Sequence, residues 1–237
     1  MNNQKFLEVV SKSFIKFLQT HSRSNEKLKI LHGAIARDLE KRLGREYLVH
    51  SLGFGKGKEA KMSGRYMDKT VDITIFKKDK DLAGVAVKFV MNNYSQNSNN
   101  YFENMLGETA NIRANKKKYY QIIVLPEELP YYDNKDTITK WEKITDNNVE
   151  KYLKLSKDDE DLFFHTPIKT LMFMIRFPDL EKNKITNKLK YKKYYLSIKN
   201  SIKLKLSSKS FIAFGNGIIL NDYESFIEKV VHSIKSI

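Results

Sequence analysis

The sequence predicts an α/β fold in which helices flank a central mixed β-sheet, with a helical N-terminal addition and a basic C-terminal addition. Two observations lead to this fold class. Apolar residues recur at helical spacing up to residue 43 and at strand spacing after residue 45. The order strand, strand, helix, strand between residues 70 and 125 then predicts a mixed sheet, because a right-handed crossover through the helix makes the last two strands parallel.

Two amphipathic helices are expected first, over residues 4–20 and 25–43, and both are interpreted as packing elements. Ser24 is the expected N-cap of the second helix and Gly44 its expected C-cap. His32 lies near the apolar stripe of this helix. We interpret it as a core histidine whose hydrogen bonds are satisfied, rather than as a ligand.

Strands are expected over residues 46–52, 70–77, 83–90 and 119–125. The third strand, AGVAVKFV, is nearly all apolar, as expected for a central strand covered on both faces. Between the first two strands lies GFGKGK, at residues 53–58. Its glycine spacing matches neither common phosphate-binding pattern, so it predicts a flexible turn.

The remaining elements are expected at less regular intervals. A polar loop, NNYSQNSNN, is expected at residues 92–100, followed by a helix over 101–114. Residues 137–155 are expected to be helical in part. The very apolar run 161–177 predicts either core or a subunit interface, and residues 223–237 predict a final amphipathic helix.

The composition limits the class of protein. The net charge of +15 indicates an anionic partner, and a nucleic-acid backbone fits best because Lys and Arg displace its counterions. The absence of cysteine excludes disulfides and thiolate metal sites. No apolar run approaches the ~20 residues of a membrane span and no signal-peptide pattern is present, so a cytoplasmic protein is expected. No linker is evident, so residues 1–237 are expected to form a single domain.

Lys88 raises the question of function, because it interrupts the apolar run GVAVKF and a buried ammonium group is costly unless it is paired. Asp72 interrupts the preceding strand in the same way. Two opposite charges on adjacent strands, each among apolar neighbours, predict a shared site. The alternative is that the two side chains point off a sheet face into solvent.

Hydrolysis of a phosphodiester bond would use such a pair. A divalent cation polarises the phosphoryl oxygens and lowers the pKa of a water, and an aspartate is a suitable oxygen ligand for Mg2+. A neighbouring lysine can orient the water and stabilise charge in the transition state. Because one aspartate binds Mg2+ weakly, a second carboxylate is expected nearby.

The sequence Asp72, a hairpin's distance, then x-Val-Lys88 resembles the PD-(D/E)XK nuclease superfamily, specifically its type II restriction endonucleases. That pattern has an acid two residues before the lysine, where this chain has Ala86. One subgroup instead places the second carboxylate on the following helix, which here carries Glu103 and Glu108. The two are about 140° apart around a helix, so only one is expected to face the metal.

The subgroup's helix pattern, Glu-x-x-Asn-apolar, matches Glu108 to Ile112 and favours Glu108, with Glu103 as the alternative. The resemblance covers about residues 45–132 and implies a restriction-endonuclease-like sheet. It also implies an Mg2+-dependent type II restriction endonuclease that cuts both strands of a short specific site in double-stranded DNA. In that case Asp72 and Glu108 bind the metal, and Lys88 positions the attacking water. A homodimer and a cognate DNA methyltransferase are the expected companions.

Further polar residues near this pattern are candidates for DNA contact or for support of the site. Glu59 is an additional acid, and Arg65 and Lys69 are expected to flank the scissile phosphate. Four asparagines on the segment after Lys88 either contact DNA or are ordinary solvated residues, the second being preferred for most: Asn97, Asn100, Asn104 and Asn111.

Residues 181–209 hold ten lysines and one acidic residue, with tyrosines interleaved. This segment is interpreted either as a surface for phosphate contacts or as a solvated charge run. The tyrosines favour a folded element, and the lysines expected to contact DNA are Lys190, Lys192 and Lys193.

Three other functions stay open at this point. A nuclease of the same fold would cleave by DNA structure without sequence preference. A DNA-binding protein of the same fold would lack catalysis, having lost the acid at Ala86. A protein of anionic membrane surfaces would use the positive charge without nucleic acid.

Overall fold

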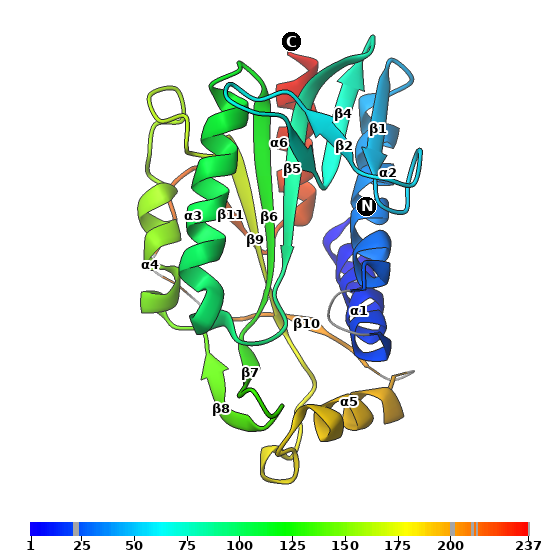
Figure 1. Cartoon of the computed structure of the whole chain (residues 1–237), viewed down its shortest axis with the longest axis vertical. Coiled ribbons are helices and arrows are strands. Elements are labelled where there is room, and N and C mark those ends of the chain that lie inside the picture. Colours follow the sequence, from blue (N-terminus) through cyan, green and yellow to red (C-terminus); the bar gives the residue numbers. More distant parts are fainter. Residues whose placement is uncertain (21–23, 200–201, 210, 212, 237) are drawn as a thin grey trace.

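The computed structural model describes residues 1–20, 24–199, 202–209, 211 and 213–236 of the chain. A central β-sheet runs along the long axis of the molecule and helices lie on both of its faces (Figure 1). The expected α/β class, with a mixed sheet flanked by helices, is therefore confirmed.

The helices are α1 (Asn3–Gln19), α2 (Glu26–Leu43), α3 (Tyr94–Arg113), α4 (Asp146–Leu155), α5 (Lys188–Ser197) and α6 (Tyr223–Lys235), with a short 3-10 helix, η1 (Lys182–Lys184). The strands are β1 (Tyr47–Ser51), β2 (Ala60–Met62), β3 (Lys69–Val71), β4 (Ile73–Lys77), β5 (Lys80–Phe89), β6 (Lys118–Pro126), β7 (Glu128–Tyr132), β8 (Ile138–Lys143), β9 (Lys169–Arg176), β10 (Lys205–Leu206) and β11 (Ile218–Leu220). Within the described residues, no helix combines the length and the hydropathy needed to cross a lipid bilayer.

The main sheet has the order β1-β4-β5-β6-β9-β10, and β11 also pairs with β9. Strands β1, β4 and β5 are antiparallel neighbours, whereas β5, β6 and β9 are parallel. The crossover from β5 to β6 passes through α3, as the order of elements predicted. Two short hairpins, β2–β3 and β7–β8, lie outside this sheet.

The side chains of β5 separate the two layers of core. Val85 and Val87 pack into the large cluster formed with α1, α2 and α6. Ala86 points the other way, into a small cluster that the β2–β3 hairpin shares with Ile112 of α3 and Tyr119 of β6. A larger cluster on this second face joins α3 and α4 to β6 and β9. A small residue at position 86 therefore leaves room for the hairpin to cover the sheet.

The expected strand 70–77 is broken at Asp72, where the chain bends from β3 into β4. Strand β3 pairs with β2, whereas β4 pairs with β1 and β5. The Asp72 side chain accepts a hydrogen bond from the Val87 amide of β5, at 2.7 Å. This bond occupies an amide that a continuing β4 would otherwise have paired.

The expected loop at 92–100 is wrong for most of its length, because α3 begins at Tyr94. The amides of Tyr94 and Ser95 donate to the carboxylate of Glu142, on β8. A side chain distant in sequence thus accepts hydrogen bonds from two backbone amides at the helix start, which have no partner within the helix. A local sequence pattern cannot reveal such a contact. Helix α2 has Asn25 as its N-cap instead of the expected Ser24, although the Ser24 hydroxyl accepts a hydrogen bond from the Glu26 amide at 3.3 Å.

The C-terminal half contains the elements that were least readable. Residues 137–155 form β8 and then α4, so the helical interpretation holds only for the second part. The apolar run 161–177 contains β9, whose residues 170–175 are buried in the core, while Phe163 and Phe164 are exposed. The basic segment 181–209 includes α5, in which Tyr191 and Tyr195 are buried, so the tyrosines did indicate a folded element.

Candidate active site

Asp72 lies where β4 begins, beside the strand that carries Lys88. Ile73 pairs with Val85 across the β4–β5 ladder, and the Asp72–Val87 hydrogen bond extends the connection by two residues along β5. This bond fixes one carboxylate oxygen of Asp72 against the backbone. Asp72 and Lys88 are both half-buried, so neither side chain stands free in solvent.

Two further side chains gather around Asp72. Ligand atoms of His32, Glu59 and Asp72 all lie within 4.8 Å of one another, and these three residues are called the His32 cluster below. His32 comes from α2, and Glu59 directly precedes β2. The carbonyl oxygen of Ala60 accepts a hydrogen bond from the Thr74 hydroxyl, at 3.4 Å, which ties the start of β2 to β4. The cluster therefore joins a helix, a hairpin and a sheet strand.

The charges of the cluster act on one another. Burial raises the pKa of Glu59, and the neighbouring charge of Asp72 raises it further. Burial lowers the pKa of His32, the charge of Asp72 opposes this shift, and the charge of Lys88 adds to it. The imidazole is therefore neutral near pH 7 and lies within electrostatic range of both Asp72 and Lys88.

His32 is buried to 1% exposure, yet neither of its ring nitrogens has a hydrogen-bond partner in the described part of the chain. His32 is a core residue, as expected, but the expectation that its hydrogen bonds are satisfied is wrong. A buried polar group without a partner costs about 1–3 kcal/mol. A neutral imidazole beside two carboxylates is a donor set suited to a divalent cation, and a bound cation would satisfy both carboxylates and the imidazole nitrogen that carries the lone pair.

Lys88 follows Val87 on β5, and the alternation of the strand places it on the same side as Ala86. Its ammonium group has no ion-pair partner within 4.0 Å among the residues described. The expectation that the lysine and the aspartate occupy neighbouring strands holds for Lys88 on β5, whereas Asp72 lies at the bend before β4 and reaches β5 through its hydrogen bond with Val87. Since the charge of Lys88 lowers the pKa of His32, the ammonium group lies within electrostatic range of the His32 cluster.

Glu108 lies outside the His32 cluster. Its carboxylate forms an ion pair with Lys69, at 2.8 Å, and accepts a hydrogen bond from the Tyr119 hydroxyl, at 3.4 Å. Burial raises the pKa of Tyr119, and the charges of Glu108 and then Asp72 raise it further, so the hydroxyl is within range of both acids. For Glu108 to bind a metal, its ion pair with Lys69 would have to open. Glu59 is the carboxylate that already stands beside Asp72.

Glu103 is exposed on α3 and is directed to another neighbour. Burial lowers the pKa of Lys151 on α4, and the charge of Glu103 opposes that shift. Glu103 therefore interacts with α4, and it is not part of the His32 cluster. As helix geometry predicts, the side chains of Glu103 and Glu108 lie on different sides of α3 and have different neighbours.

Asn111 anchors the loop between β2 and β3. Its side-chain oxygen accepts from the Tyr66 amide at 2.9 Å, and its side-chain nitrogen donates to the Met67 carbonyl at 2.9 Å. A side chain at Gly64 would collide with Asn111, since a Cβ there would lie 2.1 Å from its nitrogen. Asn111 is thus a structural residue, and the loop reaches the C-terminal end of α3 (Figure 1).

The anchored loop presents side chains to solvent next to Lys69. Tyr66 is 81% exposed and Met67 is 67% exposed. Arg65, expected near the scissile phosphate, is exposed on the same loop, and its amide donates to the Asn111 carbonyl at 2.8 Å. An aromatic ring, a thioether and a guanidinium group are therefore held outward by a fixed backbone.

The other residues expected to contact DNA are spread over two helices. On α3, Asn97 donates to the Asn93 carbonyl at 3.3 Å, while Asn100 and Asn104 are exposed. On α5, at the end of the molecule toward which β5 runs, two of the three expected lysines are exposed and one is half-buried (Figure 1). Lys190 and Lys193 are the exposed ones, and Lys192 is half-buried.

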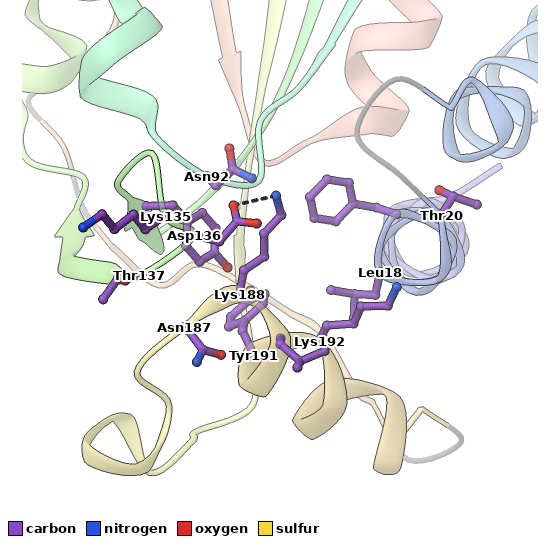
Figure 2. Close-up of a pocket in the computed structure, with 13 residues that line it drawn as sticks. Leu18, Thr20, Asn92, Lys135, Asp136, Thr137, Asn187, Lys188, Tyr191 and Lys192 are labelled. Carbon is purple, nitrogen blue, oxygen red and sulfur yellow. Dashed lines mark hydrogen bonds and ion pairs between the residues drawn. The ribbon is translucent and has the colours of Figure 1, made fainter.

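A pocket of about 540 Å³ lies between the end of α1, the β7–β8 turn and the start of α5 (Figure 2). Leu18 and Tyr191 contribute apolar wall, and Lys188 pairs with Asp136 across the opening at 2.9 Å. None of the His32 cluster lines it. The pocket belongs to the basic C-terminal region and not to the candidate active site.

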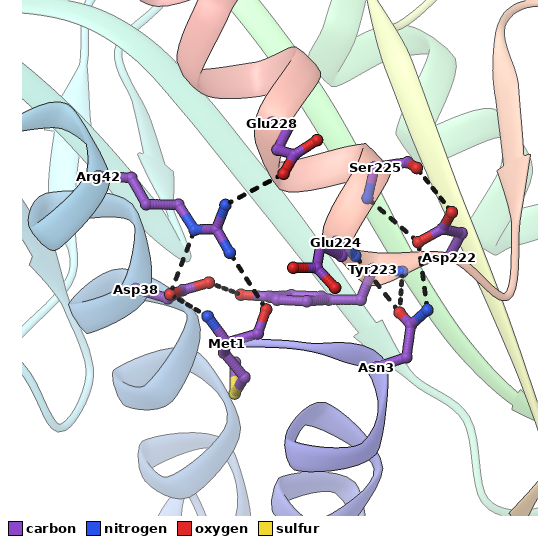
Figure 3. A network of polar contacts seen from close by, with 9 residues as sticks. All are labelled: Met1, Asn3, Asp38, Arg42, Asp222, Tyr223, Glu224, Ser225 and Glu228. Atoms are coloured by element: carbon purple, nitrogen blue, oxygen red, sulfur yellow. Dashed lines mark hydrogen bonds and ion pairs between the residues drawn. The ribbon is translucent and has the colours of Figure 1, made fainter.

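A polar network around Asp38 lies elsewhere and joins helices to one another (Figure 3). Asp38 of α2 is 8% exposed and accepts a hydrogen bond from the Tyr223 hydroxyl, at 3.1 Å. It also pairs with the amino group of Met1 and with Arg42. Since both carboxylate oxygens of Asp38 have partners, we interpret this network as structural.

No protein-family model matches the chain, and comparisons with curated proteins and with solved structures found no match.

Proposed function

We propose that the protein hydrolyses phosphodiester bonds in double-stranded DNA with the help of a divalent cation. The observation that carries this proposal is the His32 cluster beside Lys88, in a chain of net charge +15. Two carboxylates, a neutral imidazole and an ammonium group that forms no ion pair with any described residue are the groups that such a reaction uses. The positive charge favours a polyanionic substrate.

Asp72 and Glu59 would hold the cation, which when bound polarises a phosphoryl oxygen and lowers the pKa of a coordinated water. The hydrogen bond from the Val87 amide holds one carboxylate oxygen of Asp72 and so limits rotation of this group. Lys88 would orient the attacking water and stabilise the negative charge that develops on the phosphate. Glu108 would enter only after releasing Lys69, which then becomes free to contact phosphate.

The loop of residues 63–68 and the exposed lysines of α5 would contribute DNA contacts. Contacts between lysine and phosphate position the duplex without specifying its sequence. The loop differs from the lysines of α5 because it presents Tyr66 and Met67 together with Arg65. Large, largely apolar side chains of this kind can insert into a groove of the duplex.

Within this reaction class, we propose a type II restriction endonuclease. The support is the resemblance of Asp72 and Lys88, with Ala86 between them, to one subgroup of those enzymes. A homodimer would match the two-fold symmetry of a palindromic site, Mg2+ is the cation that the resemblance implies, and a cognate DNA methyltransferase would protect host DNA.

The test is cleavage of supercoiled plasmid in Mg2+ and in Mn2+, comparing the wild type with Asp72→Asn. The matched control is Asp79→Asn, at an exposed turn. Discrete bands that Asp72→Asn abolishes and Asp79→Asn retains are the expected result. A smear would instead favour a nuclease without sequence preference.

One arrangement favours a second candidate, a DNA-binding protein without catalysis. Ala86 stands where the common pattern has an acid, and Glu108 is neutralised by Lys69. Retention of a DNA duplex by a wild-type protein that cleaves in neither metal would establish this candidate and reject the nuclease.

A further inference from the structure

We infer that His32 is a nitrogen ligand of the cation in this site, and that the site therefore binds Mn2+ more tightly than Mg2+. The inference rests on the metal site of the proposed function, but it does not rest on the reaction. It goes beyond the sequence resemblance, which implies carboxylate ligands and Mg2+.

The first step is the burial of an imidazole without a partner. His32 is 1% exposed, and both Nδ1 and Nε2 lack hydrogen-bond partners in the described residues. Core histidines normally donate one ring N–H and accept at the other nitrogen. The lone pair of the His32 ring has no hydrogen-bond donor near it, but it has two carboxylates close by. A cation bound among these groups would explain this arrangement.

The second step is the distance between the ligand atoms. Those of His32, Glu59 and Asp72 lie within 4.8 Å of one another. Ligands at about 2.1 Å from one octahedral ion are separated by roughly 3–4.2 Å. The cluster therefore needs to contract by at most about 0.6 Å for a trans pair of ligands and at most about 1.8 Å for a cis pair, which side-chain rotations can supply.

The third step is the preference of the donor set. Mg2+ takes oxygen ligands and keeps several waters, so an imidazole adds little to its binding. Nitrogen ligands raise the affinity for first-row transition metals, and carboxylates suit Mn2+ as well. A site with one imidazole and two carboxylates thus binds Mn2+ more tightly than Mg2+. A site with carboxylates alone would show a smaller difference in affinity.

The fixed position of the ring supports the same conclusion. His32 lies on α2 directly before Gly33, and a Cβ at Gly33 would lie 2.8 Å from the Gly53 carbonyl oxygen. The helix therefore packs closely against the turn after β1, and the 1% exposure of His32 shows that its side chain is enclosed by neighbouring atoms. A ligand held by a packed helix loses little entropy on binding.

The test measures metal binding directly, in protein without DNA. Titrations of Mn2+ and Mg2+ are followed by thermal shift and calorimetry for the wild type, His32→Gln and the control His232→Gln, which changes an exposed histidine of α6. We expect His32→Gln to weaken Mn2+ binding by at least about 10-fold. We expect Mg2+ binding to change less, and His232→Gln to match the wild type in both metals.

A second measurement needs no variant, so it decides the matter even if His32→Gln does not fold. Pulsed electron paramagnetic resonance of the Mn2+-loaded wild type detects a directly bound imidazole through its 14N coupling. The coupling is expected, and its absence would overturn the inference, as would equal affinity for the two metals. A nitrogen-coupled Mn2+ without DNA cleavage would reject only the nuclease, whereas cleavage without that coupling would reject only the role of His32.

Discussion

The Val87 amide donates a 2.7 Å hydrogen bond to the Asp72 carboxylate, one residue before Lys88 on the same strand. The bond connects the bend between β3 and β4 to the strand that carries the lysine. The backbone of β5 thus sets the position of the aspartate and of the lysine together. A site built in this way needs no acid at Ala86, because the other carboxylate arrives from the segment before β2.

Lys88→Met tests the role of the ammonium group. The methionine chain keeps much of the length and apolar volume of lysine but cannot orient water or stabilise charge. We expect cleavage of plasmid DNA to fall by about 10²–10⁴-fold, the usual contribution of a positioned proton-transfer or charge-stabilising group. Lys80→Met, which changes an exposed residue at the start of β5, is the control and should cleave normally.

DNA affinity separates this role from simple attraction of the substrate. Fluorescence anisotropy in Ca2+ should show nearly equal binding for Lys88→Met and Lys80→Met, since each removes one positive charge. If Lys88→Met lost cleavage only in proportion to lost binding, the catalytic role of Lys88 would be rejected.

Glu59→Gln should stabilise the protein when no divalent cation is present. Burial and Asp72 raise the pKa of Glu59 in the folded state. The stabilising contribution of a group with a raised pKa is complete below its unfolded pKa, and is lost as the pH rises through the folded pKa. The ionised Glu59 therefore costs stability at pH 7, and glutamine removes this cost.

The expected increase is small, because partial exposure screens the charges. We expect the Tm of Glu59→Gln to rise by up to about 2 °C at pH 7 and to equal that of the wild type near pH 4. Glu8→Gln, which changes an exposed residue of α1, should not alter the Tm at either pH. With Mn2+ added, the order should reverse, since only the wild type retains both carboxylates. A lower Tm for Glu59→Gln in metal-free buffer would contradict this account.

The strands of the site were predictable because their signals are local. Asp72 and Lys88 each interrupt an apolar run of β-branched residues, and alternation is enough to place such residues in neighbouring strands. The parallel pairing of β5 with β6 followed from the helix between them. What the sequence did not disclose was the bend at Asp72, which depends on a bond to Val87.

The partners of Asp72 were harder to predict because they are distant in the chain. His32 and Glu59 reach the aspartate through the packing of α2 and of the β2–β3 hairpin, and neither carries a spacing signal. Glu108 had the better local pattern, yet Lys69 and Tyr119 engage it. Helical phase separates Glu103 from Glu108 but does not say which one meets the site.

Tyr66→Ala tests the anchored loop as a DNA contact. Tyr66 is 81% exposed, so its loss should leave the Tm unchanged. Contacts between an aromatic ring and a base are worth about 1–3 kcal/mol, so we expect DNA affinity to fall by roughly 5–150-fold. The control is Leu162→Ala, at another exposed apolar residue, which should bind DNA as the wild type does.

Asn111→Ala should affect the same function through the backbone. It removes the acceptor for the Tyr66 amide and the donor to the Met67 carbonyl. At about 0.5–1.5 kcal/mol for each bond, we expect a lower Tm as well as weaker DNA binding. Anisotropy and thermal unfolding would be measured together. Full DNA affinity in both Tyr66→Ala and Asn111→Ala would show that the loop does not touch the duplex.

Tyr223→Phe tests whether the Asp38 network is structural, as its satisfied contacts indicate. The hydroxyl of Tyr223 donates to Asp38 at 3.1 Å, and Tyr223 is fully buried (Figure 3). Hydrogen bonds to charged groups contribute about 1.5–3 kcal/mol, so we expect a loss of stability of that size in urea unfolding. The double variant Asp38→Asn, Tyr223→Phe should lose less free energy of unfolding than the sum of the two single losses, since both changes act on the same Tyr223–Asp38 hydrogen bond. Cleavage and metal binding of the folded variants should equal those of the wild type, and a selective loss of either would mean that this network takes part in the site.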